Sequence, residues 1–202
     1  MKKEVIEDWI QEAYGIAKAH GFHDVERKDC HWLMLITTEI AEAVEADRKG
    51  LVADYDAFLF CSKHRKTVYA ACGQDSPLGK QYHHEVLFEK YIKNTIEDEL
   101  ADIVIRCCDY LGSNGVYFAE SFTEELMKEH SFSNGFYDTF AEKTWEWVAI
   151  LNANSLPVGA RIVALLLEVI GFCEAKCIDI QRHVEWKMKY NQSRPQKHGK
   201  AY

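Results

Sequence analysis

Apolar residues recur at helical spacing along almost the whole chain. In the first stretch, Trp9, Ile10 and Ala13 fall on one face of a helix, and a glycine suited to a C-cap follows. No segment alternates for long between apolar and polar positions, so the pattern gives no reason to expect a sheet. The predicted helices cover residues 3–20, 30–48, 55–72, 85–111, 119–130, 137–151, 159–177 and 180–190. The sequence therefore predicts an all-α fold.

The chain length and the scarcity of proline limit how these helices are organised. A chain of 202 residues suits one domain with a sizeable core and is short for two large ones. Only 3 residues are proline, which favours long helices. We expect residues 1–202 to form a single helical domain.

The charge and the apolar runs of the chain limit the kinds of molecule that it is expected to bind. The formal net charge is −8, which argues against nucleic acid as a partner, because affinity for its backbone comes from phosphates neutralised by Lys and Arg. The longest uncharged apolar run, residues 162–167, is far shorter than a membrane span. We expect a protein that binds neither nucleic acid nor membrane, although a local basic patch can still bind small anions.

The cysteines indicate a reducing compartment. There are 7 of them, an odd number without repeated spacing or a leader before them, so we expect free thiols and a cytoplasmic location. Cys173 and Cys177 lie one helical turn apart, but no second Cys or His pair completes a zinc site. We expect both to be structural.

Acidic residues interrupt the apolar pattern of the predicted helix 30–48. Glu39, Glu42 and Glu45 recur every three residues among Ile, Val and Ala. Like charges at this spacing destabilise an isolated helix by about 0.2–0.5 kcal/mol per pair. Carboxylates buried among apolar neighbours are unfavourable without a cation. The pattern therefore predicts that a cation binds there.

A second acidic pair stands in the predicted helix 85–111. Glu99 and Asp102 are again three residues apart and are followed by apolar turns. If the two helices pack together, four carboxylates converge and offer the all-oxygen ligands that Mg²⁺ prefers. The alternative is a solvated face on which Asp102 pairs with Arg106 at i,i+4. A di-iron carboxylate site is not indicated, because no Glu is followed by His three residues later.

Basic residues gather near the end of this acidic chain, in the segment EWKMKYNQSRPQKHGKAY. Lys187, Asn191 and Arg194 fall at i, i+4 and i+7, so one helical face presents an ammonium, an amide and a guanidinium. Such a set suits a polyphosphate. The alternative is a solvated, frayed tail whose cations interact with the helix dipole.

These motifs together resemble a known family. Glu39-x-x-Glu42, Glu99-x-x-Asp102 and the late KMKYNQSRP and KHGK segments are similar to those of the MazG-like all-α nucleoside triphosphate pyrophosphohydrolases, relatives of dimeric dUTPases and dCTP pyrophosphatases. The resemblance lies in residues 33–46, 97–111 and 178–200. It implies an antiparallel helical bundle assembled into a homodimer or homotetramer. Compared with compact members, this chain has additional helices at about residues 50–90 and 113–175.

The resemblance also implies an activity and its residues. Glu39, Glu42, Glu99 and Asp102 are expected to bind Mg²⁺, or Mn²⁺ in its place, and Lys187, Asn191 and Arg194 to bind the triphosphate. The expected reaction is hydrolysis between the α and β phosphates of a nucleoside triphosphate, a dNTP or a modified NTP, with Glu42 taking a proton from water. Three aromatic residues are candidates for a base pocket or, alternatively, for the core: Trp32, Phe58 and Phe60.

Two other classes of function stay open from the sequence alone. One is a helical nucleotide-binding or interaction protein that keeps the fold without turnover. The other is a metal-dependent phosphohydrolase with a different cleavage position. An adjacent His-Asp metal motif is missing, because His83-His84 is followed by Glu85. Product analysis distinguishes the three.

Overall fold

The computed structural model describes residues 1–116 and 139–199. Within these ranges the regular structure is entirely helical, which confirms the predicted all-α class. The elements are α1 (Lys3–Ala19), α2 (Asp29–Arg48), α3 (Tyr55–Cys72), α4 (Pro77–Lys80), α5 (His84–Tyr91), α6 (Ile96–Ser113), α8 (Phe140–Leu151), α9 (Val158–Ala175), α10 (Ile180–Ser193) and the 3₁₀ turn η1 (Gln196–Gly199). The predicted helix 119–130 lies outside the described residues.

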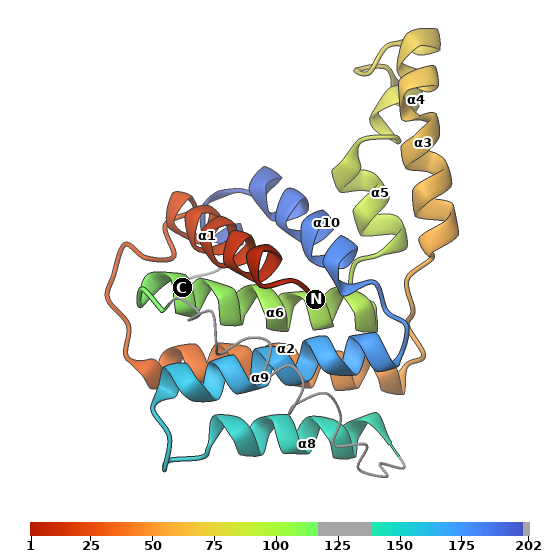
Figure 1. Ribbon diagram of the computed structural model, residues 1–202. Coiled ribbons are helices and arrows are strands. Elements are labelled where there is room, and N and C mark those ends of the chain that lie inside the picture. The colour runs from red at the N-terminus through yellow and green to blue at the C-terminus, as the bar shows by residue number, and fades with distance from the viewer. Residues whose placement is uncertain (117–138, 200–202) are drawn as a thin grey trace.

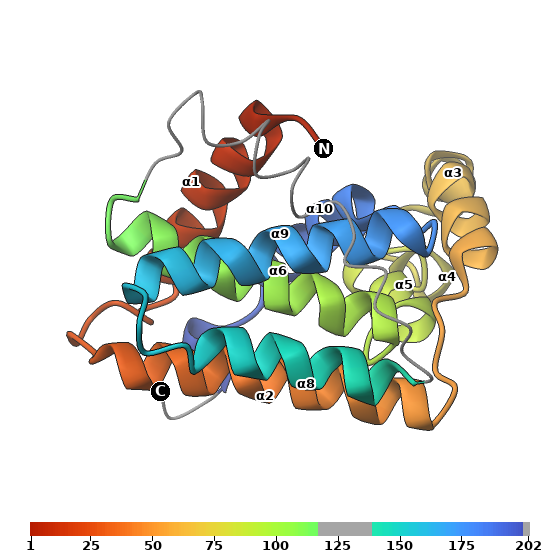
Figure 2. The ribbon, with the colours of Figure 1, turned by 60° about the horizontal axis from the view of Figure 1, so that its bottom comes forward.

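Helix α6 lies at the centre of the fold. It packs against α1, α2, α9 and α10, while α8 covers α9 and α2 (Figures 1 and 2). From Leu100 to Leu111 nearly every α6 residue is buried, which explains why this helix is apolar on most sides beyond its first turn. Helices α2 and α10 both pack against α6, so acidic and basic residues far apart in the sequence come together.

The described part of segment 113–175 adds helices α8 and α9 to this core. In α9, Leu165, Leu166 and Val169 are buried against the rest of the main cluster, and Trp147 of α8 is fully buried beside them. Helix α8 begins with a capping box, in which Thr139 and Glu142 exchange side-chain and backbone hydrogen bonds. The four helices α2, α6, α8 and α9 lie alongside one another as a bundle (Figure 2).

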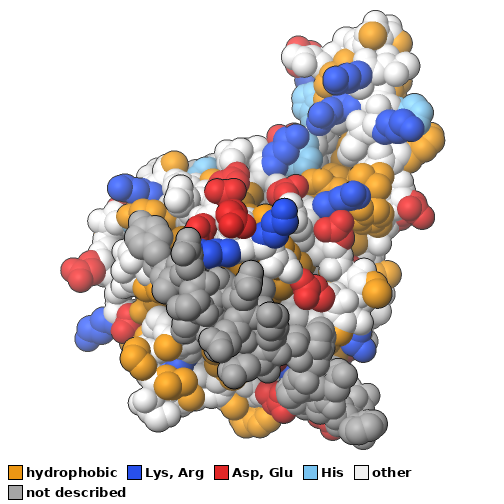
Figure 3. All heavy atoms as spheres, viewed as in Figure 1, with side chains coloured by type: hydrophobic (Ala, Val, Ile, Leu, Met, Phe, Trp, Pro, Cys, Tyr) orange, Lys and Arg blue, Asp and Glu red, His pale blue; other side chains and the backbone are white. Residues whose placement is uncertain are grey.

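Helices α3, α4 and α5 project from this bundle as an arm, residues 55–91 (Figure 1). A separate small cluster holds the base of the arm to α10, where the Phe88 and Tyr190 rings stack with centroids 4.6 Å apart. Only Phe58 of α3 is buried, and the outer part of the arm carries Lys, Arg and His side chains (Figure 3). The arm is therefore the least enclosed part of the described fold.

One predicted helix is wrong in its continuity. The sequence pattern gave a single helix over 85–111, but α5 ends at Tyr91 and α6 begins at Ile96. The break is at Asn94, whose φ of 62° is left-handed, and at Thr95, whose side chain caps α6 by accepting from the Asp98 N–H. This turn leads directly into the acidic part of α6.

In the described ranges no helix has the length and apolarity that a membrane span requires.

Candidate functional site

A cavity of about 150 Å³ lies between α1, α2, α6 and α10. Its lining has three parts: acids of α2 and α6, basic and amide side chains of α10 and of the turn before α6, and apolar residues of α1 and α10. All seven residues predicted for the site line this one cavity: Glu39, Glu42, Glu99, Asp102, Lys187, Asn191 and Arg194. The fold thus brings together residues that are up to 155 positions apart in the sequence (194 − 39).

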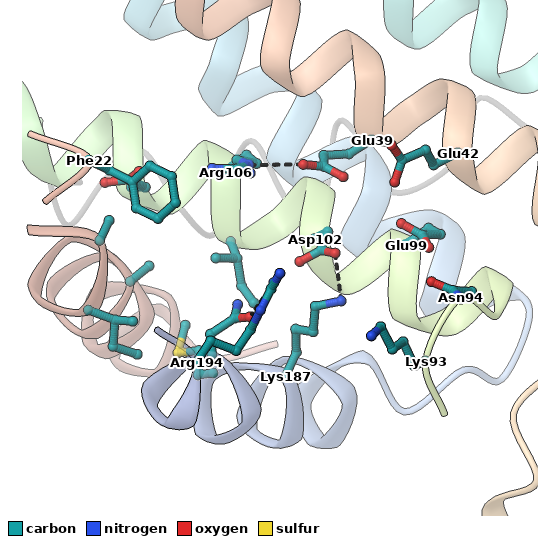
Figure 4. Close-up of a pocket in the computed structure, with 17 residues that line it drawn as sticks. Phe22, Glu39, Glu42, Lys93, Asn94, Glu99, Asp102, Arg106, Lys187 and Arg194 are labelled. Carbon is teal, nitrogen blue, oxygen red and sulfur yellow. Dashed lines mark hydrogen bonds and ion pairs between the residues drawn. The ribbon is translucent and has the colours of Figure 1, made fainter. Parts of the chain in front are cut away.

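The acidic part joins two helices. Glu39, Glu42 and Glu99 each place a carboxylate oxygen within 4.8 Å of the others, in an arrangement that can hold a metal ion (Figure 4). Glu39 and Glu99 are buried, whereas Glu42 is exposed. The i,i+3 spacing in α2 and the packing of α2 on α6 bring together three of the four predicted metal ligands. The fourth, Asp102, is not in this group and pairs with Lys187.

Glu39 is paired with a cation of the chain itself. Its Oε1 accepts a hydrogen bond of 2.9 Å from Nε of Arg106. Burial and the nearby Asp102 carboxylate raise the pKa of Glu39, and Arg106 opposes that rise. The predicted solvated pair between Asp102 and Arg106 is not the one formed, because Arg106 reaches across to α2 instead.

Glu99 has a carboxylate oxygen without a protein partner. Its Oε2 is buried and accepts no hydrogen bond from the described residues. Burial, with the negative charges of Asp102 and Asp98 added, raises the pKa of Glu99 to about 8. A buried carboxylate oxygen without a donor is unfavourable, and either a proton or a bound cation can relieve that cost at Glu99.

Lys187 faces the acids from α10. Its Nζ lies 2.6 Å from Oδ2 of Asp102 and 2.7 Å from Oδ1 of Asp98. Burial favours the neutral amine, but the two carboxylates outweigh it and raise the pKa of Lys187, which stays charged. Figure 4 shows Lys187 pointing at Asp102 from below, between Arg194 and Lys93.

Asp98 was not predicted as a site residue, yet it anchors Lys187. It is 1% exposed, does not line the cavity, and accepts the Asn94 N–H at Oδ2 with a distance of 2.9 Å. The left-handed turn at Asn94 therefore fixes Asp98, and Asp98 fixes Lys187 from the side away from the cavity. A Thr-x-x-Asp capping signal at 95–98 was the available sequence clue.

Two other residues that line the cavity were not predicted from the sequence. Lys93 lines the cavity from the turn before α6, held by Glu89 at 3.3 Å and by the Tyr190 hydroxyl at 3.2 Å. Phe22 lines the end near Arg106, with the guanidinium carbon 5.8 Å from its ring centroid. No sequence signal pointed to either residue.

The aromatic residues considered for a base pocket lie elsewhere. Trp32 is buried and stacks on His23, Phe58 is buried at the base of the arm, and Phe60 is 62% exposed. None of these three lines the cavity, so the alternative interpretation holds for Trp32 and Phe58, which are core residues.

Comparisons of the chain with protein-family models, with curated proteins and with solved structures give no match. The chemistry of the site therefore rests on its residues. Acids that can hold a divalent cation lie beside four cationic side chains in one cavity, those of Lys93, Arg106, Lys187 and Arg194. This combination suits an anion that binds together with a metal ion, such as a polyphosphate.

Proposed function

We propose that this protein hydrolyses a nucleoside triphosphate between its α and β phosphates in the presence of Mg²⁺, giving a nucleoside monophosphate and pyrophosphate. The observation that carries the proposal is the meeting of Glu39, Glu42 and Glu99 in the wall of a cavity that Lys93, Lys187 and Arg194 also line. Phosphates need positive charge on their oxygens, and both a metal ion and these side chains provide it.

The residues present fit a divalent cation. Glu99 Oε2 is buried without a hydrogen-bond donor, and the three glutamates supply oxygen ligands only. Glu39, Glu42, Glu99 and Asp102 would hold the ion, with Mn²⁺ as a substitute for Mg²⁺. When bound, the ion supplies positive charge to the phosphates and acidifies water.

Glu42 is the best candidate for the base that takes a proton from the attacking water. A base must be ionised and accessible, and Glu42 is exposed at the cavity. Glu39 and Asp102 are bound by Arg106 and Lys187, and the raised pKa of Glu99 keeps its carboxyl protonated at neutral pH in the absence of a metal. Neither Arg106 nor Lys187 pairs with Glu42, so its carboxylate is open to the cavity.

The cations of α10 would bind the leaving pyrophosphate. Lys187 is held from behind by Asp98, so its ammonium can exchange Asp102 for a phosphate oxygen without losing its position. Arg194 has a guanidinium that can donate two parallel hydrogen bonds to phosphate, and Asn191 beside it can donate through its amide.

A second candidate is a non-catalytic helical protein that binds nucleotides. The pairs Glu39–Arg106 and Asp102–Lys187 favour it, because side chains of the protein already neutralise two of the four acids. In that case the cavity binds a nucleotide and releases it unchanged.

Identification of the phosphorus products distinguishes these functions. The purified protein is incubated with Mg²⁺ and a panel of common and modified ribo- and deoxyribonucleoside triphosphates. Pyrophosphate with monophosphate supports the proposal, whereas tripolyphosphate or orthophosphate indicates another cleavage position. Absence of Mg²⁺-dependent turnover across the panel would leave the binding protein as the better account.

Glu42→Gln tests the roles assigned to Glu42, because it removes the charge of the side chain at nearly constant volume. It should abolish Mg²⁺-dependent turnover in a folded protein. The control is Glu45→Gln, one helical turn further on, where an exposed glutamate pairs with Arg48 and Lys49 away from the cavity. Full activity of Glu42→Gln would contradict its assigned roles.

A further inference from the structure

One acid in the cavity lining stands apart from the metal-binding group. Asp109 lies on α6, two turns beyond Asp102, and is 2% exposed. It lines the cavity together with Phe22, Ala13 and Ile16, which are apolar. The proposed hydrolysis assigns it no role, because the grouped carboxylates are those of Glu39, Glu42 and Glu99.

A rigid aromatic support fixes the orientation of Asp109. His23 Nε2 lies 2.6 Å from Oδ1 of Asp109. The His23 ring stacks on Trp32 with centroids 5.1 Å apart and planes 19° apart, and Tyr14 meets it edge-on at 4.9 Å. An imidazole held between two rings leaves the carboxylate little freedom, which is the condition for a selective hydrogen-bonding group.

The charges in the lining orient a bound nucleotide. Phosphates are attracted to the part with Lys93, Lys187 and Arg194 and repelled by the Asp109 carboxylate. The charge of Arg106, the cation beside Phe22, is already balanced by its 2.9 Å hydrogen bond to Glu39. The other part offers a phenyl ring and aliphatic side chains, which suit a flat heterocycle. A nucleotide with its phosphates on the cations therefore brings its base toward Phe22 and Asp109.

We propose that Asp109 selects nucleotides whose base carries an exocyclic amino group, namely adenine, cytosine or guanine, over thymine and uracil. A carboxylate accepts hydrogen bonds and donates none, so it pairs well with an amino N–H. The ring N3–H of thymine and uracil is a poorer donor for it, because that N–H lies between two carbonyl oxygens that repel the carboxylate. The choice of triphosphates as substrates rests on the proposed function, whereas the base preference is a property of this part of the cavity.

Two measurements on the intact protein test the preference. The first is kcat/KM with Mg²⁺ for dATP, dCTP and dGTP against dTTP and dUTP. The second is calorimetric binding of dAMP, dCMP, dGMP, dTMP and dUMP in EDTA, which needs no catalysis. In each measurement the best amino-bearing nucleotide should exceed the thymine and uracil nucleotides by at least about tenfold, since a site built around one hydrogen bond discriminates against a base whose only donor stands between two repelling oxygens.

Asp109→Asn is the informative variant. The amide keeps an oxygen for His23 and adds an N–H donor, which can reach a base carbonyl, so discrimination should fall by at least about tenfold or reverse. Asp47→Asn, at an exposed position near the end of α2, is the control and should keep the wild-type preference. If Asp109→Asn does not fold, the base preference measured on the wild-type protein alone decides whether the proposal stands.

The possible results separate the two proposals. Turnover of all five triphosphates at similar kcat/KM, with equal binding of the monophosphates, overturns the role of Asp109 and leaves the hydrolase intact. Selective binding of dAMP, dCMP or dGMP without turnover of any triphosphate supports the role of Asp109 and overturns the hydrolase. A preference that survives in Asp109→Asn also overturns the role of Asp109.

Discussion

Nζ of Lys187 lies 2.6 Å from Oδ2 of Asp102, which joins the last helix of the described fold to its central one. Asp98 holds the same ammonium from behind at 2.7 Å, and Lys187 is only 5% exposed. The interaction is therefore largely shielded from water, so breaking it should affect the stability of the fold.

Removing this ammonium should destabilise the protein. Lys187→Met leaves Asp98 buried and unpaired, which is expected to lower the free energy of unfolding by about 3–5 kcal/mol. Urea denaturation measures the change. Lys189→Met, at an exposed position on the same helix, is the control and should change stability little. Equal losses in the two variants would mean that the buried pairs contribute nothing of their own.

The cap of α6 should contribute a smaller amount. Thr95 accepts the Asp98 N–H through its hydroxyl, so Thr95→Ala should lower the free energy of unfolding by about 1 kcal/mol. Thr95→Ser keeps the hydroxyl and should recover most of the loss in the same denaturation experiment. A serine variant as unstable as the alanine variant would contradict the capping role.

The metal-free protein should lose stability as the pH rises. The pKa of Glu99 is about 8 in the folded protein against an ordinary 4.5. Between about pH 4.5 and about pH 8 the folded state keeps a proton that the unfolded state has lost, so the free energy of unfolding falls across that window. Glu99→Gln cannot lose this proton. In EDTA, its unfolding curves should show a weaker fall with pH than those of the wild type or of Glu45→Gln.

Mg²⁺ should stabilise the folded protein if the acids bind it. An ion that binds only the folded state adds about 2.7 kcal/mol at a hundredfold excess over its dissociation constant. Thermal unfolding with and without Mg²⁺ measures this, and Glu42→Gln should show a much smaller rise than Glu45→Gln. Identical rises in the two variants would place the bound ion outside the cavity.

Replacing Arg194 should weaken the use of a triphosphate substrate more than it lowers the stability of the fold. Arg194→Ala is expected to lower kcat/KM by about tenfold or more, mainly through KM, because a charged hydrogen bond contributes about 1.5–3 kcal/mol. Arg182→Ala is the control, since Arg182 pairs with Asp179 near the exposed start of α10. Unchanged kinetics in Arg194→Ala would remove it from the phosphate site.

The periodicity of apolar residues located most helices to within a few residues, because helical spacing follows directly from which face is buried. It missed the break between α5 and α6, where Asn94 is left-handed. Apolar residues continue through this break, since Ile92 is buried on one side and Leu100 on the other. The hydrophobic pattern alone therefore does not distinguish a tight turn from an unbroken helix.

The sequence also predicted three acids that converge, Glu39, Glu42 and Glu99, but not what they contact, and it included Asp102, which is not in this group. Glu39 and Glu42 stood out because carboxylates are unusual among apolar neighbours. The partner of Glu39 is Arg106, which i,i+4 spacing had assigned to Asp102. Pairings within a helix can be read from spacing, whereas Arg106–Glu39 and Lys187–Asp98 depend on how helices pack.

The central place of α6 has a consequence for how the molecule opens. Glu99, Asp102 and Asp109 lie on a helix that other helices surround, so its backbone amides should exchange with deuterated solvent only when the whole domain unfolds. The arm has few buried side chains, and its amides should exchange through local opening at much lower energy. At moderate denaturant concentrations the projecting helices should therefore unfold while the residues that line the cavity still hold their positions.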